Sequence, residues 1–184
     1  MELVQPSAEY KDSFIEAVKE FQTDEDYTHR NKWYRALSIA DLDKDFNAFV
    51  EKQRDLMRSG NVESELPSAR VPQTEYWLIE DKKYIGRISI RHQLNEQLSY
   101  IGGHVGFDIR PSERGKGYGN HIFELAFPKA KELGLQRVLL TCDERNVASR
   151  KIIEKFGGVF ENSVPNHEKG FEGHDARRYW IDIK

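Results

Sequence analysis

The sequence holds one cysteine, Cys142, in 184 residues, so the chain cannot form an internal disulfide. It also lacks the run of roughly 20 apolar residues that a membrane helix needs, and its first residues, MELVQPSAEYKD, lack the basic start of a secretion signal. Basic residues are not in excess, since the formal net charge is −3, which disfavours nucleic acid and anionic membranes as partners. These absences predict a cytoplasmic protein.

Hydrophobic residues make up 38% of the chain and charged residues 32%, a balance typical of a folded globular domain. We expect one domain over 1–184, because this length supports a single core but is short for two. Helices and a long loop are expected within 1–73. Most of the sheet is expected within 74–184.

The pattern of apolar residues changes along the chain. Helical spacing follows Ser7, a predicted N-cap, and returns over 41–58 before a polar loop at 59–73. Extended runs are then predicted on both sides of a charged turn at 80–83, and again over 99–109. Helical and strand patterns alternate after that point. The order predicts one α/β domain.

Residues 106–120, GFDIRPSERGKGYGN, place three glycines at every second position after an extended run. A P-loop is excluded because Gly117 follows Lys116 where serine or threonine is required. A dinucleotide fingerprint is weakly supported because the spacing is G-x-G-x-G and other elements precede it. The third pattern, R-x-x-G-x-G, is met by Arg114, Gly117 and Gly119.

That third pattern suits a phosphate group. Glycines remove Cβ atoms, so that successive backbone N–H groups can converge on an anion at the start of a helix. Arg114 and Lys116 would neutralise its charge. The alternative is a plain glycine-rich turn before a helix, with Arg114 in solvent.

Three stretches decide between these alternatives: GFDIRPSERGKGYG (106–119), RVLLTCDERNVAS (137–149) and KIIEKFGGVFEN (151–162). Together they resemble the core of the GNAT superfamily of acetyl-CoA-dependent N-acetyltransferases, over Ile101–Phe160, about a third of the chain. The resemblance implies an α+β fold with a mixed, mainly antiparallel twisted sheet of about seven strands. Roughly four helices would cover both faces, and the fourth and fifth strands would splay apart.

The resemblance also implies which residues bind acetyl-CoA. The pyrophosphate would lie on the amides of the loop and first helical turn: Arg114, Gly115, Lys116, Gly117, Tyr118, Gly119 and Asn120. Backbone groups of a bulged strand would hold the pantetheine arm: Phe107, Asp108 and Ile109. Asn146 would reach the same arm or act only as a helix N-cap, and Ser149 is a weaker assignment. No metal is expected.

The catalytic groups are less well defined by the resemblance. The tyrosine that protonates the leaving thiolate in many members is replaced here by Ile153, so water or another group would act, or the thiolate would leave unaided. His104 is the first candidate base because its ordinary pKa suits neutral pH, and Asp108 is the second. Packing on the sheet is the alternative role for His104, and exposure to solvent is the alternative for Asp108.

The acceptor site is expected at Asp24–Asp26, Tyr27, His29 and the loop 59–73, where acidic and aromatic groups would hold an ammonium. Asp143 and Glu144 are further candidates, and Cys142 is expected in the core. The sequence thus predicts transfer of an acetyl group to a small-molecule or peptide amine in a ternary complex. A non-catalytic acyl-CoA sensor is the alternative, and monomer and homodimer both stay open.

Overall fold

The computed structural model describes residues 1–25, 32–59, 71–167 and 173–184. Within them lie seven strands: β1 Glu2–Val4, β2 Gln73–Glu80, β3 Lys83–Arg91, β4 Val105–Ile109, β5 Arg137–Asp143, β6 Val159–Pro165 and β7 Asp175–Asp182. They also contain seven α-helices: α1 Lys11–Thr23, α2 Lys32–Arg35, α3 Ile39–Lys44, α4 Phe46–Ser59, α5 Glu96–Tyr100, α6 Tyr118–Glu132 and α7 Val147–Lys155. Four of these helices have nine residues or more, in line with the expected number.

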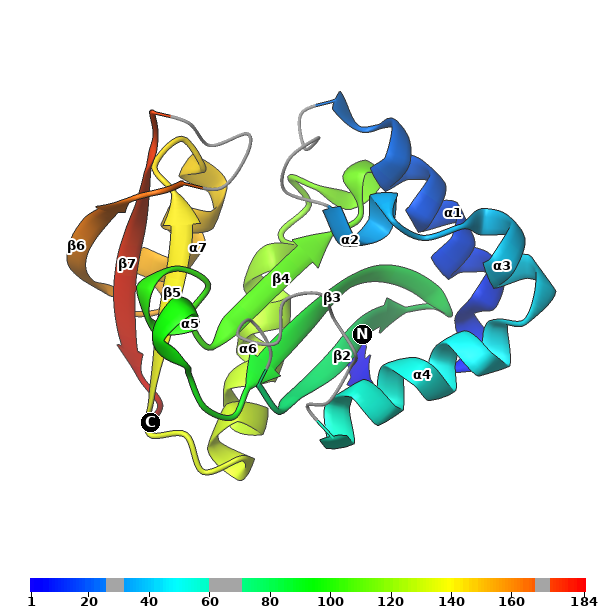
Figure 1. Ribbon diagram of the computed structural model, residues 1–184, viewed down its shortest axis with the longest axis horizontal. Helices are drawn as coiled ribbons and strands as arrows, with labels where there is room; N and C mark the ends of the chain where they lie inside the picture. Colours follow the sequence, from blue (N-terminus) through cyan, green and yellow to red (C-terminus); the bar gives the residue numbers. More distant parts are fainter. Residues whose placement is uncertain (26–31, 60–70, 168–172) are drawn as a thin grey trace.

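The strands form two antiparallel sheets that diverge from each other. One has the order β1-β2-β3-β4 and the other β5-β7-β6. The neighbouring strands β4 and β5 separate toward their C-terminal ends (Figure 1). The expected α+β fold, with seven strands and a splay between the fourth and fifth, is confirmed, but the single mixed sheet is replaced by two antiparallel sheets because the splay leaves no ladder between β4 and β5.

The two sheets meet at the start of β4. The N–H of His104 donates to the carbonyl of Leu139 in β5 over 2.7 Å. Gly103, just before it, has φ +63, and a Cβ at this position would lie 2.3 Å from the Leu139 carbonyl oxygen. Only glycine therefore lets the strands approach this closely.

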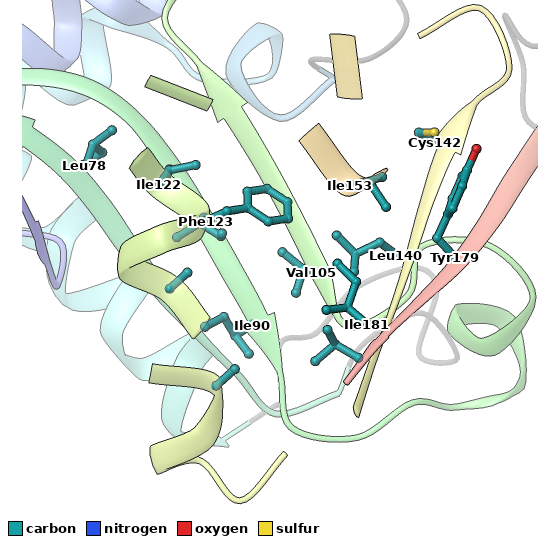
Figure 2. Packing of buried hydrophobic residues seen from close by; sticks show 14 of the residues in the cluster. Leu78, Ile90, Val105, Ile122, Phe123, Leu140, Cys142, Ile153, Tyr179 and Ile181 are labelled. Atoms are coloured by element: carbon teal, nitrogen blue, oxygen red, sulfur yellow. The ribbon is translucent and has the colours of Figure 1, made fainter. Parts of the chain in front are cut away.

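Two hydrophobic clusters cover the two faces of the first sheet. Residues of α6, α7 and both sheets form the larger one, which includes Ile90, Phe123 and Leu140 (Figure 2). The other lies under α1–α4, where Phe14 stacks on Trp77 with ring centroids 4.7 Å apart. Because side chains alternate along a strand, β3 sends Ile88 and Ile90 into the first cluster and its polar residues to the opposite face.

The predicted hairpin is confirmed, with a turn in which Asp81 and Lys82 both have positive φ. The extended run expected over 99–109 is partly wrong. Its first residues belong to α5, which Asn95 caps by accepting a hydrogen bond from the N–H of Leu98 at 2.9 Å. Gly102 and Gly103 then adopt positive φ, so the strand starts only after them.

The expected bulge in this strand is also wrong. β4 pairs with β3 in unbroken register from Val105 to Ile109. The irregularity of this sheet lies instead between β2 and β3, where Leu78 pairs with Gly86 and Ile79 with Tyr84, so Ile85 of β3 is the extra residue. Gly102 and Gly103 serve the turn and the contact with β5 rather than a bulge.

The helical region expected over 41–58 is two helices, α3 and α4, separated at Asp45. The Asp45 carboxylate accepts a hydrogen bond from the N–H of Ala48 at 2.9 Å and thereby starts the second helix. Ser7 caps the first helical turn as predicted, because its Oγ accepts from the N–H of Glu9.

Candidate active site

A cleft of about 490 Å³ opens between β4 and β5 and reaches the N-terminal ends of α6 and α7. It brings together most of the residues that the sequence singled out: Phe107, Asp108, Ile109, Arg114, Gly115, Tyr118, Gly119, Asn146 and Ser149. The side chains of His104, Lys116 and Asn120 and the glycine Gly117 are not part of its lining.

The loop before α6 offers five consecutive backbone donors. In the described structure, no acceptor meets the N–H groups of Gly115, Lys116, Gly117, Tyr118 or Gly119. The expected set was wider, but the N–H of Arg114 donates to Pro111 and that of Asn120 to Gly117. Five free donors at a helix start form an anion site, to which the helix dipole adds.

Glycine is required at two positions of this loop. Gly115 has φ +75 and Gly117, the N-cap of α6, has φ +91. An added Cβ would meet open space at both, so the backbone conformation, rather than crowding, explains these two residues. Gly119 differs, because a Cβ there would lie 2.6 Å from Cδ1 of Ile152 on α7.

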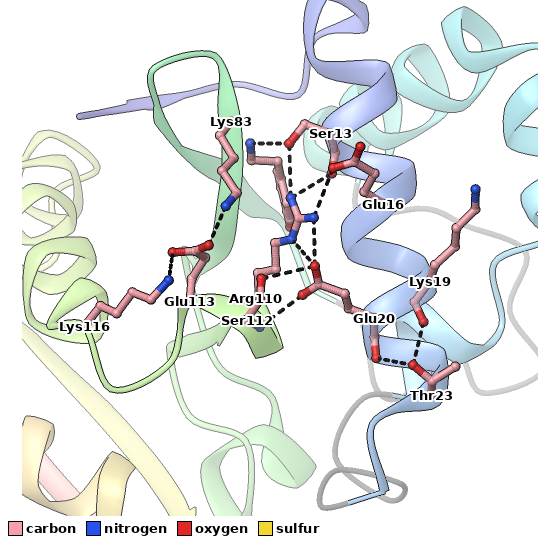
Figure 3. Close-up of polar contacts among 11 residues, drawn as sticks. Ser13, Glu16, Lys19, Glu20, Thr23, Lys83, Arg110, Ser112, Glu113 and Lys116 are labelled. Atoms are coloured by element: carbon pink, nitrogen blue, oxygen red, sulfur yellow. Dashed lines mark hydrogen bonds and ion pairs between the residues drawn. The ribbon is translucent and has the colours of Figure 1, made fainter.

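Ion pairs fix the charged side chains beside the loop. Arg114 pairs with Asp24 of α1's C-terminal end at 2.6 Å, and Lys116 pairs with Glu113 at 2.9 Å. Lys83 contacts the same Glu113, and these hydrogen bonds lower the pKa of that carboxyl group (Figure 3). Asp24 pairs with Arg114, whereas Lys83 and Lys116 share one carboxylate and keep a net positive charge, so this charge and the free amides both attract an anion to the loop.

Arg110 anchors the start of the loop to α1. It is buried, and it pairs with Glu20 at 2.8 Å and with Glu16 at 3.1 Å (Figure 3). The carboxylate of Glu20 also accepts from the N–H of Ser112. The start of the glycine-rich loop that precedes α6 is therefore anchored to α1.

The two strand edges that face the cleft carry unpaired backbone groups. The N–H of Arg91 donates to the carbonyl of His104, and the N–H of Arg110 donates to the carbonyl of Ile85. In an antiparallel ladder, every second residue directs its backbone groups to the neighbouring strand. Because His104 and Arg110 bond to β3, the even-numbered residues of β4 face β3. Phe107 and Ile109 therefore direct their backbone groups away from β3, into the cleft. By the same reasoning, Thr141 of β5 faces the cleft from the other side.

Asn146 caps α7 on the opposite wall. Its side-chain oxygen accepts from the N–H of Ser149 at 3.1 Å, so the N-cap role is observed, and both residues also line the cleft. Ile153, at the position of the family's usual tyrosine, is buried and lines the cleft too. No side chain at that position can donate a proton.

His104 occupies the base of the splay, outside the cleft. Its Nδ1 accepts a hydrogen bond from the N–H of Leu139 at 2.9 Å, so the proton of the neutral ring lies on Nε2. Burial, followed by the charge of Arg91, lowers the pKa of His104. This geometry gives His104 a structural role, and its predicted role as a base gains no support.

Asp108 points from β4 to the face opposite α6. It pairs with Arg87 at 3.0 Å, and Arg87 also pairs with the buried Glu75 at 3.1 Å. The Arg87 guanidinium lies 3.9 Å from the ring centroid of Trp33, so it is held from several sides. Sequence reasoning missed this cluster, although the alternation in GRISIR, residues 86–91, places Arg87, Ser89 and Arg91 on one face of β3.

Other predicted residues have structural partners. Asp143 holds Arg145 at 2.9 Å, and Glu144 meets His174 at 3.1 Å. Cys142 is buried in the core as expected, and its side chain also borders the cleft. Asp26, Tyr27, His29 and nearly all of the loop 59–73 lie outside the described residues.

The described ranges contain no group of three or more histidine, cysteine or acidic side chains arranged to hold a metal ion. No helix in them is long and apolar enough to cross a bilayer.

Comparison with known proteins adds to this geometry. The acetyltransferase (GNAT) domain family matches residues 12–159. An uncharacterized N-acetyltransferase of Bacillus subtilis, YnaD, is 32% identical over 93 residues, which cover 45% of this chain. The match spans about half of that relative, 51% of its length.

Solved structures of low sequence identity share the fold. RimL, a ribosomal L7/L12 α-N-protein acetyltransferase in complex with coenzyme A, aligns with a TM-score of 0.70 and 15% identity over 98% of this chain and 93% of its own. MccE, a microcin C7 self-immunity acetyltransferase with acetyl-CoA and AMP, gives the same score and identity over 98% and 91%. A GNAT acetyltransferase from Streptococcus pneumoniae aligns over 100% of both chains at 20% identity, with a TM-score of 0.63. With the family matched over most of its length, and with the splayed sheets and amide-lined loop in place, the chain belongs to the GNAT acetyltransferase family.

Proposed function

We propose that the chain transfers the acetyl group of acetyl-CoA to a primary amine by direct attack within a ternary complex. Membership of the GNAT family makes it an acetyltransferase. The observation that carries the rest is the continuity between the five free amides of Gly115–Gly119 and the unpaired edges of β4 and β5. The diphosphate of acetyl-CoA suits the loop amides, and the amide groups of its pantetheine arm suit the strand edges.

The donor would bind in two parts. Its pyrophosphate would take the loop amides, with Arg114 and Lys116 beside it. Its pantetheine amides would pair with the backbone of Phe107 and Ile109, as an added strand pairs with a sheet edge. Asn146 and Ser149 would contact the arm from α7.

The reaction needs one bond made and one broken. The neutral amine attacks the thioester carbonyl, the C–N bond forms, the C–S bond breaks, and the nitrogen loses a proton while sulfur leaves as a thiolate. A backbone N–H on the free edge of β4 would stabilise the intermediate oxyanion. A thiolate is a stable leaving group, so the absence of a tyrosine at Ile153 need not stop the reaction.

Of the two predicted catalytic side chains, Asp108 is the better supported. It lines the cleft on the face that α6 does not cover, where an acceptor can approach. Its carboxylate would attract the protonated amine and take part in its deprotonation. His104 would act by joining β4 to β5, as its hydrogen bond to Leu139 indicates.

The acceptor in this proposal is a small-molecule or peptide amine, and the location is the cytoplasm. Net charge −3 supports an acceptor other than nucleic acid, and the lone cysteine supports a reducing compartment. The structural neighbours RimL and MccE are named for a ribosomal protein and for microcin immunity, so the shared fold does not by itself select the acceptor.

The alternative function, a non-catalytic acyl-CoA sensor, rests on Ile153, because many acetyltransferases of this family have at that position a tyrosine that protonates the leaving thiolate. Acetyl-CoA should raise the melting temperature under either function, while ATP and NAD should leave it unchanged. Release of free coenzyme A in the presence of a broad amine panel then separates the two. Amine-dependent release supports the enzyme, and binding with no release by any amine supports the sensor.

A further inference from the structure

The cleft contains one arginine whose charge is not balanced by a carboxylate. Three arginines line it, and Arg87 and Arg114 each form ion pairs with acidic side chains. Arg91 forms none within the described chain. Its Nη1 donates to the carbonyls of Gly102 and Gly103, at 3.2 and 2.8 Å.

These two bonds fix the guanidinium and leave one of its edges open. Among the described residues, neither Nε nor Nη2 of Arg91 has an acceptor. Gly106 on β4 keeps the space beside this edge clear, because a Cβ there would lie 3.9 Å from Nη2 and 3.3 Å from Oγ of Ser89. An Nε–Nη2 edge presents two parallel N–H groups, the geometry that suits the two oxygens of a carboxylate or phosphate.

The electrostatics favour an anion at this edge. Burial, followed by the charge of Arg87, lowers the pKa of Arg91 to about 10. A partly buried cation without a counterion is costly, and an entering oxyanion would remove that cost.

The position of Arg91 separates it from the phosphate loop. The backbone N–H of Arg91 donates to the carbonyl of His104, directly before β4, whereas the glycine loop begins after Arg110, beyond the other end of β4. Six residues of extended chain span about 20 Å. In addition, Arg91 shares the face of β3 that carries Arg87 and faces away from α6. An oxyanion at Arg91 therefore comes from the acceptor and not from the pyrophosphate.

The other end of this face has the opposite charge. Glu75 and Asp108 share the single guanidinium of Arg87, which leaves an excess of negative charge there. Arg87 and Arg91 lie four residues apart on β3, about 13 Å along the strand. The face thus presents a negative end and a positive end to a bound acceptor.

We propose that the acceptor carries an oxyanion, a carboxylate or a phosphate, in addition to its amine, and that Arg91 binds this oxyanion. The inference rests on the proposed acetyl transfer and narrows its acceptor class. The amine would lie toward Asp108 and the oxyanion toward Arg91, so that the acceptor aligns along β3.

Matched acceptors test the proposal. The first series is ω-amino acids from glycine to 6-aminohexanoic acid, the second is alkylamines of equal length, and 2-aminoethyl phosphate represents the phosphate arm. In the wild-type protein, kcat/KM should be about 10- to 100-fold higher for the best oxyanion-bearing amine than for its alkylamine, the effect of one charge-assisted interaction. The preferred member then identifies the oxyanion and its distance from the amine.

Three variants locate the effect. Arg91→Gln keeps an NH2 group for the two glycine carbonyls but should abolish the preference, and Arg91→Lys should retain part of it. The control is Arg137→Gln, which removes an exposed arginine paired with Asp182 outside the cleft and should leave the preference intact. Equal rates with and without an oxyanion in the wild type, or an unchanged preference in Arg91→Gln, would overturn the proposal.

A binding measurement keeps the test independent of turnover. Acetate and phosphate are titrated into the coenzyme A-saturated protein, and the melting temperature is followed. Stabilisation of the wild type but not of Arg91→Gln supports the oxyanion site, and equal responses of both overturn it. Failure of every amine to release coenzyme A contradicts only the proposed acetyl transfer.

Discussion

The Nδ1 atom of His104 accepts a hydrogen bond from the backbone N–H of Leu139, and this bond ties β4 to β5 where the two sheets meet. The N–H of His104 returns a bond to the Leu139 carbonyl. One histidine therefore closes the base of the cleft with both its backbone and its ring.

Replacement of His104 by asparagine separates its structural role from a catalytic one. The asparagine oxygen can accept the same bond, whereas His104→Ala leaves the Leu139 N–H unsatisfied and should lose about 1–3 kcal/mol of unfolding free energy. The folded state holds the pKa of His104 below its unfolded value of about 6.5, so the unfolded chain binds more protons as the pH falls. The contribution of His104 to stability is then present above pH ~6.5 and is lost as the pH falls below it.

Denaturant titrations at several pH values between 5 and 8 measure this effect. The wild type should lose stability below pH ~6.5 more steeply than His104→Asn. The acidic limb of the kcat/KM profile should persist in the asparagine variant. Its disappearance, with the fold intact, would assign the catalytic base to His104.

Substitution of Gly117 tests the anion site at the start of α6. Gly117→Asp places a carboxylate among the free amides and should weaken acetyl-CoA binding by at least about 100-fold, measured by calorimetric titration. Gly117→Ala should cost about 1 kcal/mol of stability because φ is positive there.

Gly134 provides the matched control for strain. It has φ +82, and a Cβ there also meets open space, but it lies at the opposite end of α6. Gly134→Ala should therefore lose similar stability and keep wild-type affinity for acetyl-CoA. An unchanged affinity in Gly117→Asp would refute the assignment of the loop.

Removal of the Asp108 charge tests the acceptor side. Asp108→Asn should lower kcat/KM at least about 10-fold without changing the affinity for acetyl-CoA, because the loop and strand edges are untouched. Glu75→Gln is the control, since it removes the other carboxylate of Arg87 but does not line the cleft. Both variants should lose about 1–3 kcal/mol of stability, measured by urea unfolding. Equal kcat/KM values for the two variants would contradict a direct role of Asp108.

Local sequence patterns predicted the glycine-rich turn before α6 and the start of that helix. A glycine with positive φ and a helix start are short-range features, so spacing alone indicated a glycine turn before a helix at Gly117, and the resemblance assigned that turn to a phosphate. The order of strands and helices, together with the resemblance, predicted the splay between β4 and β5. Local alternation also predicted the hairpin around Asp81 and Lys82.

Features that depend on contacts between distant segments were not predicted. The bond between His104 and Leu139 joins residues 35 positions apart, and nothing near His104 indicates its partner. The cluster of Glu75, Arg87 and Asp108 requires the register of three strands. The alternation of polar residues in β3 was visible in the sequence. Whether those residues line a cleft depends on how the N-terminal helices pack on the same face of the sheet, which the sequence does not show.

Because β4 pairs with β3 in unbroken register, the length of β4 determines which way each of its residues faces. Phe107 and Ile109 offer backbone groups to the donor, while Asp108 between them presents a side chain to the acceptor. A single inserted residue would reverse both orientations at once, turning the amides toward β3 and the carboxylate into the apolar core. Donor binding and acceptor binding therefore both depend on the length of this five-residue segment.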